Sequence, residues 1–177
     1  MNTVSDRCST SAVTWAPLLN STEAAELAVE FKSGAQVTAL VEQRSETVFT
    51  PFFLSDAVRV APGDYDGTSL IASFGTGTRG RLSLTGEGTV GGFYGGRRTS
   101  GTLVASWHPT PPLTVTGEYQ HERLSVADQR ATLRVLRGRA AVSWSSRLST
   151  SVVVQHSTAA HLTSINARAR SLLRPWV

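Results

Sequence analysis

Glu87 and Glu118 are the two residues in this 177-residue sequence whose type and placement come closest to catalysis. Each occupies a polar position in a segment where apolar and polar residues alternate. Two carboxylates that converge on one sugar can cleave a glycosidic bond. The same carboxylates could instead balance the charge of nearby arginines. We favour this structural role, and we keep an outer-membrane glycan-processing enzyme as an alternative.

Other catalytic and cofactor motifs are not recognisable. The histidines at 108, 121, 156 and 161 lie in separate segments, with no spacing that pairs one with a nucleophile and an orienting group. Cys8 is the only cysteine, which excludes an internal disulfide and a Cys/His metal set. The glycine-rich runs 75–80 and 92–96 lack the lysine of a phosphate-binding loop. The sequence therefore predicts no enzyme activity, no catalytic residue, no metal and no cofactor.

Arginine dominates the positive charge of the chain. The net charge is +4, and Lys32 is the only lysine. A basic chain can bind nucleic acid, but that interpretation needs an exposed groove with interleaved aromatic residues. Here the arginines recur with a period of two, which places them along strand faces. We therefore predict no nucleic-acid partner and a polar, arginine-rich interior wall.

The residues predicted to line this interior share a polar side chain on the polar side of an alternating segment. They are Arg81, Glu87, Glu118, Gln120, Arg134, Arg137, Arg139, Gln155, Arg168 and Arg170. Arginines around a pore favour anions. We favour a structural ladder in which the arginines face Glu87 and Glu118, with a selective filter as the alternative.

Alternation of two is the dominant pattern from residue 25 onward, and it predicts β-strands. The expected strands span residues 25–32, 36–42, 68–76, 81–90, 103–107, 113–120, 131–145, 149–156 and 161–173. A short helix at 23–32 is the less favoured alternative for the first of them. The predicted fold is all-β: an antiparallel up-and-down meander of about nine long strands, part of a transmembrane β-barrel.

Two local irregularities are expected. Residues 1–22 have no clear period and are predicted to be an irregular leader or partial strand, ahead of a β-barrel segment at 23–177. Within 131–145 the apolar positions change from odd (Leu133, Val135) to even (Ala140, Val142). This change of parity predicts a β-bulge near residues 137–139.

A membrane barrel is favoured over a soluble fold for three reasons. The strands are long, whereas soluble strands average about 5–6 residues. The polar side mixes charged and hydroxyl residues, as a wet interior requires. Aromatic residues that suit a lipid–water interface fall near strand ends: Phe93, Tyr94, Trp107, Tyr119 and Trp144. The alternative is a soluble β-sandwich or lipocalin-like barrel that acts as a binding module.

Several segments in order carry a family resemblance. They are Phe31-Lys32-Ser33-Gly34-Ala35, Glu46 to Phe52, Val60 to Tyr65, Gly92 to Arg97, Trp107-His108-Pro109, Val154 to Ser157, Asn166-Ala167-Arg168 and Arg174-Pro175. Together they resemble the C-terminal outer-membrane β-barrel domain, of unknown function, in large bacterial proteins that also carry an N-terminal carbohydrate-binding family-9-like module. The resemblance covers roughly residues 25–177.

The resemblance implies a place in the bacterial outer membrane. The implied partners are membrane lipid, the remainder of the barrel chain, and carbohydrate only through the N-terminal module. Solute passage or structural anchoring of that module would be the role. The sequence departs from the family where the chain stops at Trp176-Val177 without a terminal aromatic residue, and its start lacks the apolar core of a signal peptide. We therefore expect a fragment of the family's barrel.

Overall fold

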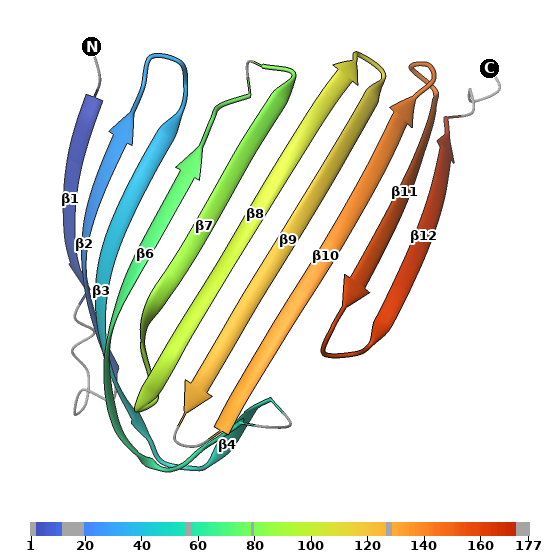
Figure 1. Ribbon diagram of the computed structural model, residues 1–177. Coiled ribbons are helices and arrows are strands. Elements are labelled where there is room, and N and C mark those ends of the chain that lie inside the picture. The colour runs from blue at the N-terminus through green and yellow to red at the C-terminus, as the bar shows by residue number, and fades with distance from the viewer. Residues whose placement is uncertain (1–2, 12–19, 56–57, 79, 127–128, 173–177) are drawn as a thin grey trace, which may run out of the picture.

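The computed structural model describes residues 3–11, 20–55, 58–78, 80–126 and 129–172. These residues form one ten-stranded antiparallel sheet and a separate two-stranded hairpin (Figure 1). The main sheet contains β1 (Thr3–Ser11), β2 (Asn20–Glu30), β3 (Gln36–Val48), β6 (Gly63–Gly75), β7 (Leu82–Phe93), β8 (Gly96–Thr110), β9 (Leu113–Val126), β10 (Gln129–Ser143), β11 (Leu148–Ser157) and β12 (Leu162–Ser171). The hairpin contains β4 (Phe52–Ser55) and β5 (Val58–Val60).

The strands of the main sheet lie side by side in chain order, which confirms the predicted all-β antiparallel meander. The helix alternative at 23–32 is wrong, because β2 occupies most of this range as a strand. Strand β1 lies within the range expected to be a leader or partial strand, and β2 begins three residues before the predicted boundary at residue 23. The described sheet is open, with β1 and β12 as its two edges.

Strand β10 runs without the predicted bulge. It pairs with β9 in continuous register from Gln129–Val126 to Val142–Leu113, and its pairing with β11 is equally unbroken. Leu133 and Val135 therefore share a face with Arg137 and Arg139. Their apolar character is explained by a distant part of the sequence, because the β4–β5 hairpin packs against β9 and β10 on that face.

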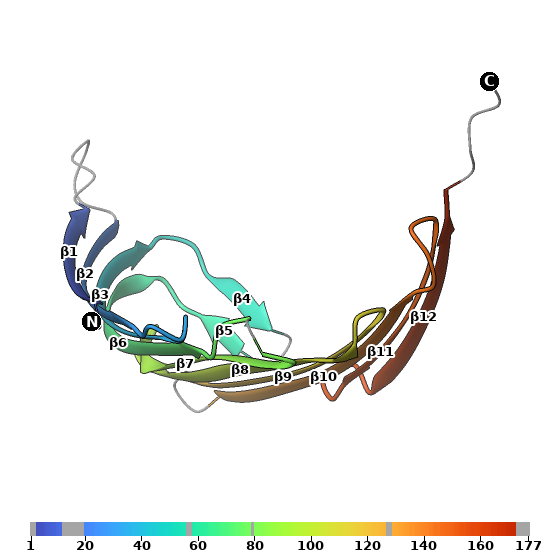
Figure 2. The same cartoon turned by 90° about the horizontal axis from the view of Figure 1, so that it is seen from above.

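The hairpin forms the small hydrophobic core of the described chain. Figure 2 presents the sheet from above as an open trough, with β4 and β5 on its concave side. The buried apolar residues among the described ones are Val48, Val58, Val60 and Val126, which come from the hairpin and from the strand ends beside it. The Arg59 amide also donates a 2.6 Å hydrogen bond to Gln129 Oε1 at the start of β10. These contacts fix the hairpin over one end of the concave face.

The two faces of the sheet differ in chemistry, and β6 illustrates the difference. Leu70, Ala72 and Phe74 alternate with Ser69 and Ser73, and it is the apolar set that is exposed. Cross-strand pairing carries the same apolar side through the neighbouring strands to Leu27, Leu103 and Tyr119, each 43–47% exposed. A sheet with one face in water normally buries its apolar side chains. Here the convex face is apolar and the concave face is polar.

The accessible surface of the chain reflects this inversion. A compact globular protein of 18.9 kDa exposes about 8,300 Å² of surface. This chain exposes 12969 Å². In the described part, the hairpin is the only element outside the main sheet, and it covers the concave side. The apolar convex face therefore has no covering layer among the described residues.

The apolar band on the convex face ends in one cross-strand row from β2 to β7, at Ala25, Val41, Leu70 and Val90, and its limit shifts on the strands that follow. On β7 the last apolar residue of the band is Val90. The residues paired with it across the neighbouring strands, which form its row, are Thr99 on β8 and Arg123 on β9. On β9 the last apolar residue is Tyr119, four residues from Arg123, and its row continues to Leu136 and His156. Beyond β7 the limit of the band thus crosses successive rows in one direction. Strands that run at an angle to the plane bounding the band produce this displacement.

In the ranges that the structure describes, no helix is long and apolar enough to cross a membrane.

Candidate functional site on the concave face

Most of the residues predicted to line an interior lie on the concave face. Cross-strand register places eight of the ten on this face: Glu87, Glu118, Gln120, Arg137, Arg139, Gln155, Arg168 and Arg170. They are brought together by β7 and by β9 to β12, whose polar positions align across the strands.

The other two predicted residues lie elsewhere. Arg81 precedes β7 in the turn, where its carbonyl oxygen accepts a 2.7 Å hydrogen bond from the His108 amide. Arg134 pairs across strands with His121, which itself pairs with Gly101, and this row belongs to the convex face. The sequence interpretation put Arg134 inside because it assumed a bulge between this residue and Arg139. Without the bulge, the two arginines face opposite sides.

A charged ladder occupies the middle of the concave face. Arg137 Nη1 lies 3.1 Å from Glu118 Oε2, and the same guanidinium donates two hydrogen bonds, of 3.1 and 3.0 Å, to Gln155 Oε1. Gln120 donates a 2.6 Å hydrogen bond to the other oxygen of Glu118. The ladder therefore joins β9, β10 and β11, and it neutralises Arg137. Of the two glutamates in the predicted ladder, Glu118 forms an ion pair and Glu87 forms none among the described residues.

A second ion pair on this face was not anticipated from the sequence. Arg98 Nε lies 3.0 Å from Glu122 Oε1, and the Arg98 guanidinium lies 5.5 Å from the centre of the Phe93 ring. The alternation of apolar and polar residues could have indicated this pair, because Arg98 and Glu122 both occupy polar positions of adjacent alternating strands.

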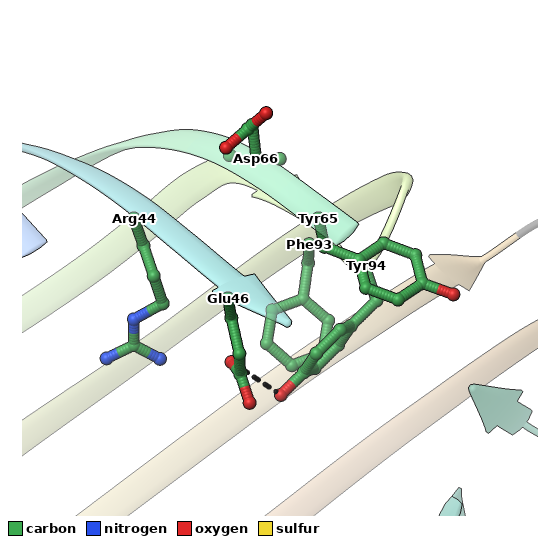
Figure 3. A pocket seen from close by; sticks show the side chains of 8 residues that line it. Arg44, Glu46, Tyr65, Asp66, Phe93 and Tyr94 are labelled. Carbon is green, nitrogen blue, oxygen red and sulfur yellow. Dashed lines mark hydrogen bonds between the residues drawn. The ribbon is translucent and has the colours of Figure 1, made fainter. Parts of the chain in front are cut away.

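An aromatic cluster lies where the hairpin meets the sheet (Figure 3). The Tyr94 ring makes edge-to-face contacts with Phe52, Tyr65 and Phe93 at centroid distances of 5.5, 5.3 and 4.6 Å. Its hydroxyl donates a 3.0 Å hydrogen bond to Glu46 Oε2. The cluster borders a shallow pocket, with about 280 Å³ of space that is open to solvent, whose lining includes Arg44 and Glu46. Phe93 and Tyr94, which the sequence analysis assigned to a lipid–water interface, both line this pocket.

Local backbone geometry explains how Tyr94 reaches the pocket. Tyr94 and Gly95 both have positive φ, at 46° and 70°. Two such residues make the tight turn that suits a right-twisted hairpin. Burial raises the pKa of the Tyr94 phenol, and the hydrogen bond and negative charge of Glu46 raise it further, while Arg44 opposes them. The phenol is therefore held in its neutral, hydrogen-bonded form.

A basic groove lies at the other side of the concave face, on β10 to β12. It has about 640 Å³ of space, open to solvent, and its lining residues are Arg139, Ala141, Val142, Ser143, Ser149, Thr150, Ser151, Arg168 and Arg170. We call this the basic groove. The ion pairs of the described residues join Arg44, Arg98 and Arg137 to glutamates, and none of them involves an arginine of the basic groove.

The carboxylate pair considered for catalysis is not formed. Glu87 pairs with Thr102 on β8, and Thr102 pairs with Gln120 on β9, so β8 separates Glu87 from Glu118. Glu118 is also occupied by Arg137 and Gln120. Within the described ranges, no group of three or more His, Cys, Asp or Glu residues could hold a metal ion.

Comparison with known proteins adds no assignment to this geometry. The sequence matches no protein-family model, and no curated protein is similar enough to match it.

Proposed function

We propose that this chain forms part of the wall of a bacterial outer-membrane β-barrel. The convex face contacts lipid, and the concave face borders a water-filled interior. The role of the barrel is passage of a small solute, or anchoring of a carbohydrate-binding module at the membrane. Lipid and the remainder of the barrel are then the partners of the chain.

The observation that carries this proposal is the exposed apolar convex face. Leu27, Leu70 and Leu103 lie on it within a continuous band, while the polar residues gather on the concave side. In water, an exposed apolar surface of this extent is a liability, because it drives association. In a bilayer the same surface is the favourable one, since outer-membrane barrels alternate apolar-out and polar-in along every strand.

Strand length and edge chemistry support the same proposal. Strands β2, β3 and β6 to β12 have between 10 and 15 residues, and a tilted membrane-spanning strand needs about 9–11. The oblique limit of the apolar band fits strands that cross a membrane at an angle. Lipid offers no hydrogen bonds to an open edge, so we infer that β1 and β12 pair with further strands of the barrel.

Cell fractionation tests the membrane assignment. The chain, expressed with an export signal in a Gram-negative host, should sediment with the outer membrane and be released only by detergent. Recovery in the soluble fraction without detergent would contradict the proposal and would favour a water-soluble binding module. Conductance in planar bilayers then separates the two roles, because a solute-passing barrel gives discrete conductance steps and a purely structural one does not.

A further inference from the structure

Three arginines of the basic groove lie close together on adjacent concave-face rows. Arg168 is in the row of Ser151 and Ala141, and Arg170 is in the row of Ser149 and Ser143. Arg139 occupies the next row, from β10, so the guanidinium groups approach the groove from both of its sides. Strand β11 lies between them and contributes Ser149 and Ser151 to the floor.

These three arginines differ from Arg137, a neighbouring arginine of the concave face. Arg137 lies one position along the concave face of β10 from Arg139, yet it is fully engaged by Glu118 and Gln155. Among the residues that the structure describes, no carboxylate side chain lines the basic groove. Three uncompensated positive charges at this spacing repel one another, so a counter-charge in the groove is favourable.

The chemistry of the lining indicates what that counter-charge is. Guanidinium groups are donors in a planar fork that matches carboxylate, phosphate or sulfate oxygens. Serine and threonine hydroxyls add single donors between them. We propose that the basic groove binds a small oxyanion with two or more charged groups. Its place on the inner wall of a barrel rests on the proposed function, but the binding chemistry does not.

Inorganic pyrophosphate is the probe for this site. The full-length chain, purified from whichever cell fraction contains it, is titrated with pyrophosphate in a calorimeter at about 0.15 M ionic strength, where charges more than about 8 Å apart are largely screened. A triple variant of the basic groove, Arg139→Gln, Arg168→Gln and Arg170→Gln, is compared with a matched triple variant of the convex face, Arg123→Gln, Arg130→Gln and Arg134→Gln. Both variants lose the same charge, and register places the second set on the opposite face of β9 and β10.

Loss of a charge-assisted hydrogen bond weakens binding by about tenfold. The groove triple should therefore lose at least that much affinity, while the convex-face triple stays within about twofold of the wild type. Wild-type affinity in the groove triple, an equal loss in the two triples, or no binding by the wild-type chain overturns the proposal. If circular dichroism shows that the groove triple is unfolded, the single variants Arg168→Gln and Arg170→Gln decide by the same criterion, because both side chains are exposed on an edge strand.

The outcome is separable from that of the membrane assignment. Selective pyrophosphate binding by a chain recovered in the soluble fraction upholds the groove and overturns the barrel. A chain that inserts into membranes and binds no pyrophosphate upholds the barrel and overturns the groove.

Discussion

The convex and concave faces of this sheet are built from the same strands by the same alternation, yet they meet different surroundings. On the convex face, Leu70 and Leu103 are 47% and 45% exposed, and glycine or alanine often stands between such residues. On the concave face, Glu118 and Arg137 are tied together, and the hairpin covers the end near Val126. The concave face thus holds ion pairs and a covering hairpin, whereas large apolar side chains of the convex face are almost half exposed.

The difference shows that a period of two identifies a strand but not its solvent. A soluble sheet and a membrane sheet have the same alternation, and they differ in which face the rest of the protein covers. In this chain the only covering element of the described part, the β4–β5 hairpin, lies on the polar side. Matched substitutions on the two faces therefore test the barrel proposal most directly.

The largest effect is expected from a charge on the convex face. Leu103→Arg and Thr102→Arg change adjacent residues of β8 that point to opposite faces at nearly the same depth. If the convex face meets lipid, Leu103→Arg should destabilise the membrane-inserted fold by about 2–4 kcal/mol, whereas Thr102→Arg should be almost neutral. Urea titration of the protein folded into lipid vesicles measures both.

Equal tolerance of the two arginines would contradict the assignment of the faces. In a water-soluble sheet, an arginine in place of the exposed Leu103 would cost little, because the position already faces solvent.

The next effect concerns the hairpin, which gives the concave face its only hydrophobic core in the described chain. Val58 is fully buried, so Val58→Ala should cost about 2 kcal/mol for two lost methyl groups and the space they leave. The hairpin should open more often as a unit. Exchange of the Arg59 amide hydrogen, which is bonded to Gln129, should accelerate by about 30-fold.

Phe53→Ala is the matched control for the hairpin, because Phe53 lies on β4 and is 70% exposed. It should leave the exchange of the Arg59 amide unchanged. Faster exchange in both variants would indicate that the hairpin is not held by its valine core.

The hairpin also marks the limit of what the sequence could predict. The long strands were recognisable because each repeats its alternation several times, and β7 and β9 lie close to their expected ranges. Strand β5 has three residues, Val58–Val60, which is too short for a period to be read. The sequence therefore predicted no strand between residues 42 and 68, where the hairpin lies.

The same hairpin explains the wrong prediction in β10. Leu133 and Val135 are apolar at positions of the polar face, and a bulge was the local explanation for that parity. The structure has a nonlocal one, since the hairpin, from a distant part of the sequence, packs on this end of β9 and β10. The position of Arg134 followed from the same assumption. Periodicity describes one strand at a time, so it cannot register a partner that arrives from elsewhere in the chain.

The aromatic cluster gives a smaller and pH-dependent effect. Tyr94→Phe removes the hydrogen bond to Glu46 and should destabilise the junction of the hairpin with the sheet by about 1 kcal/mol at neutral pH. The pKa of the Tyr94 phenol is raised above its usual 10.0, so folding favours the neutral form. The stabilisation is therefore complete below pH 10 and is lost as the pH rises through the higher pKa of the folded state.

Denaturant titration between pH 7 and pH 11 checks this dependence. The wild type should approach the stability of Tyr94→Phe at the alkaline end. A constant difference between the two proteins across this range would mean that the phenol is not held neutral by its surroundings.

The smallest effect is expected at the charged ladder, where two glutamates of the concave face are compared. Glu118 is paired with Arg137, and Glu87 has no ion pair among the described residues. Glu118→Gln should cost about 1 kcal/mol or less, because the Arg137 side chain is 44% exposed and such pairs are screened by solvent. Glu87→Gln should cost nothing measurable.

Urea titration at low and high salt tests the pair, since the difference between the variants should shrink as salt screens the charges. An equal loss in both variants would mean that the concave face is stabilised by its overall charge balance rather than by this ladder.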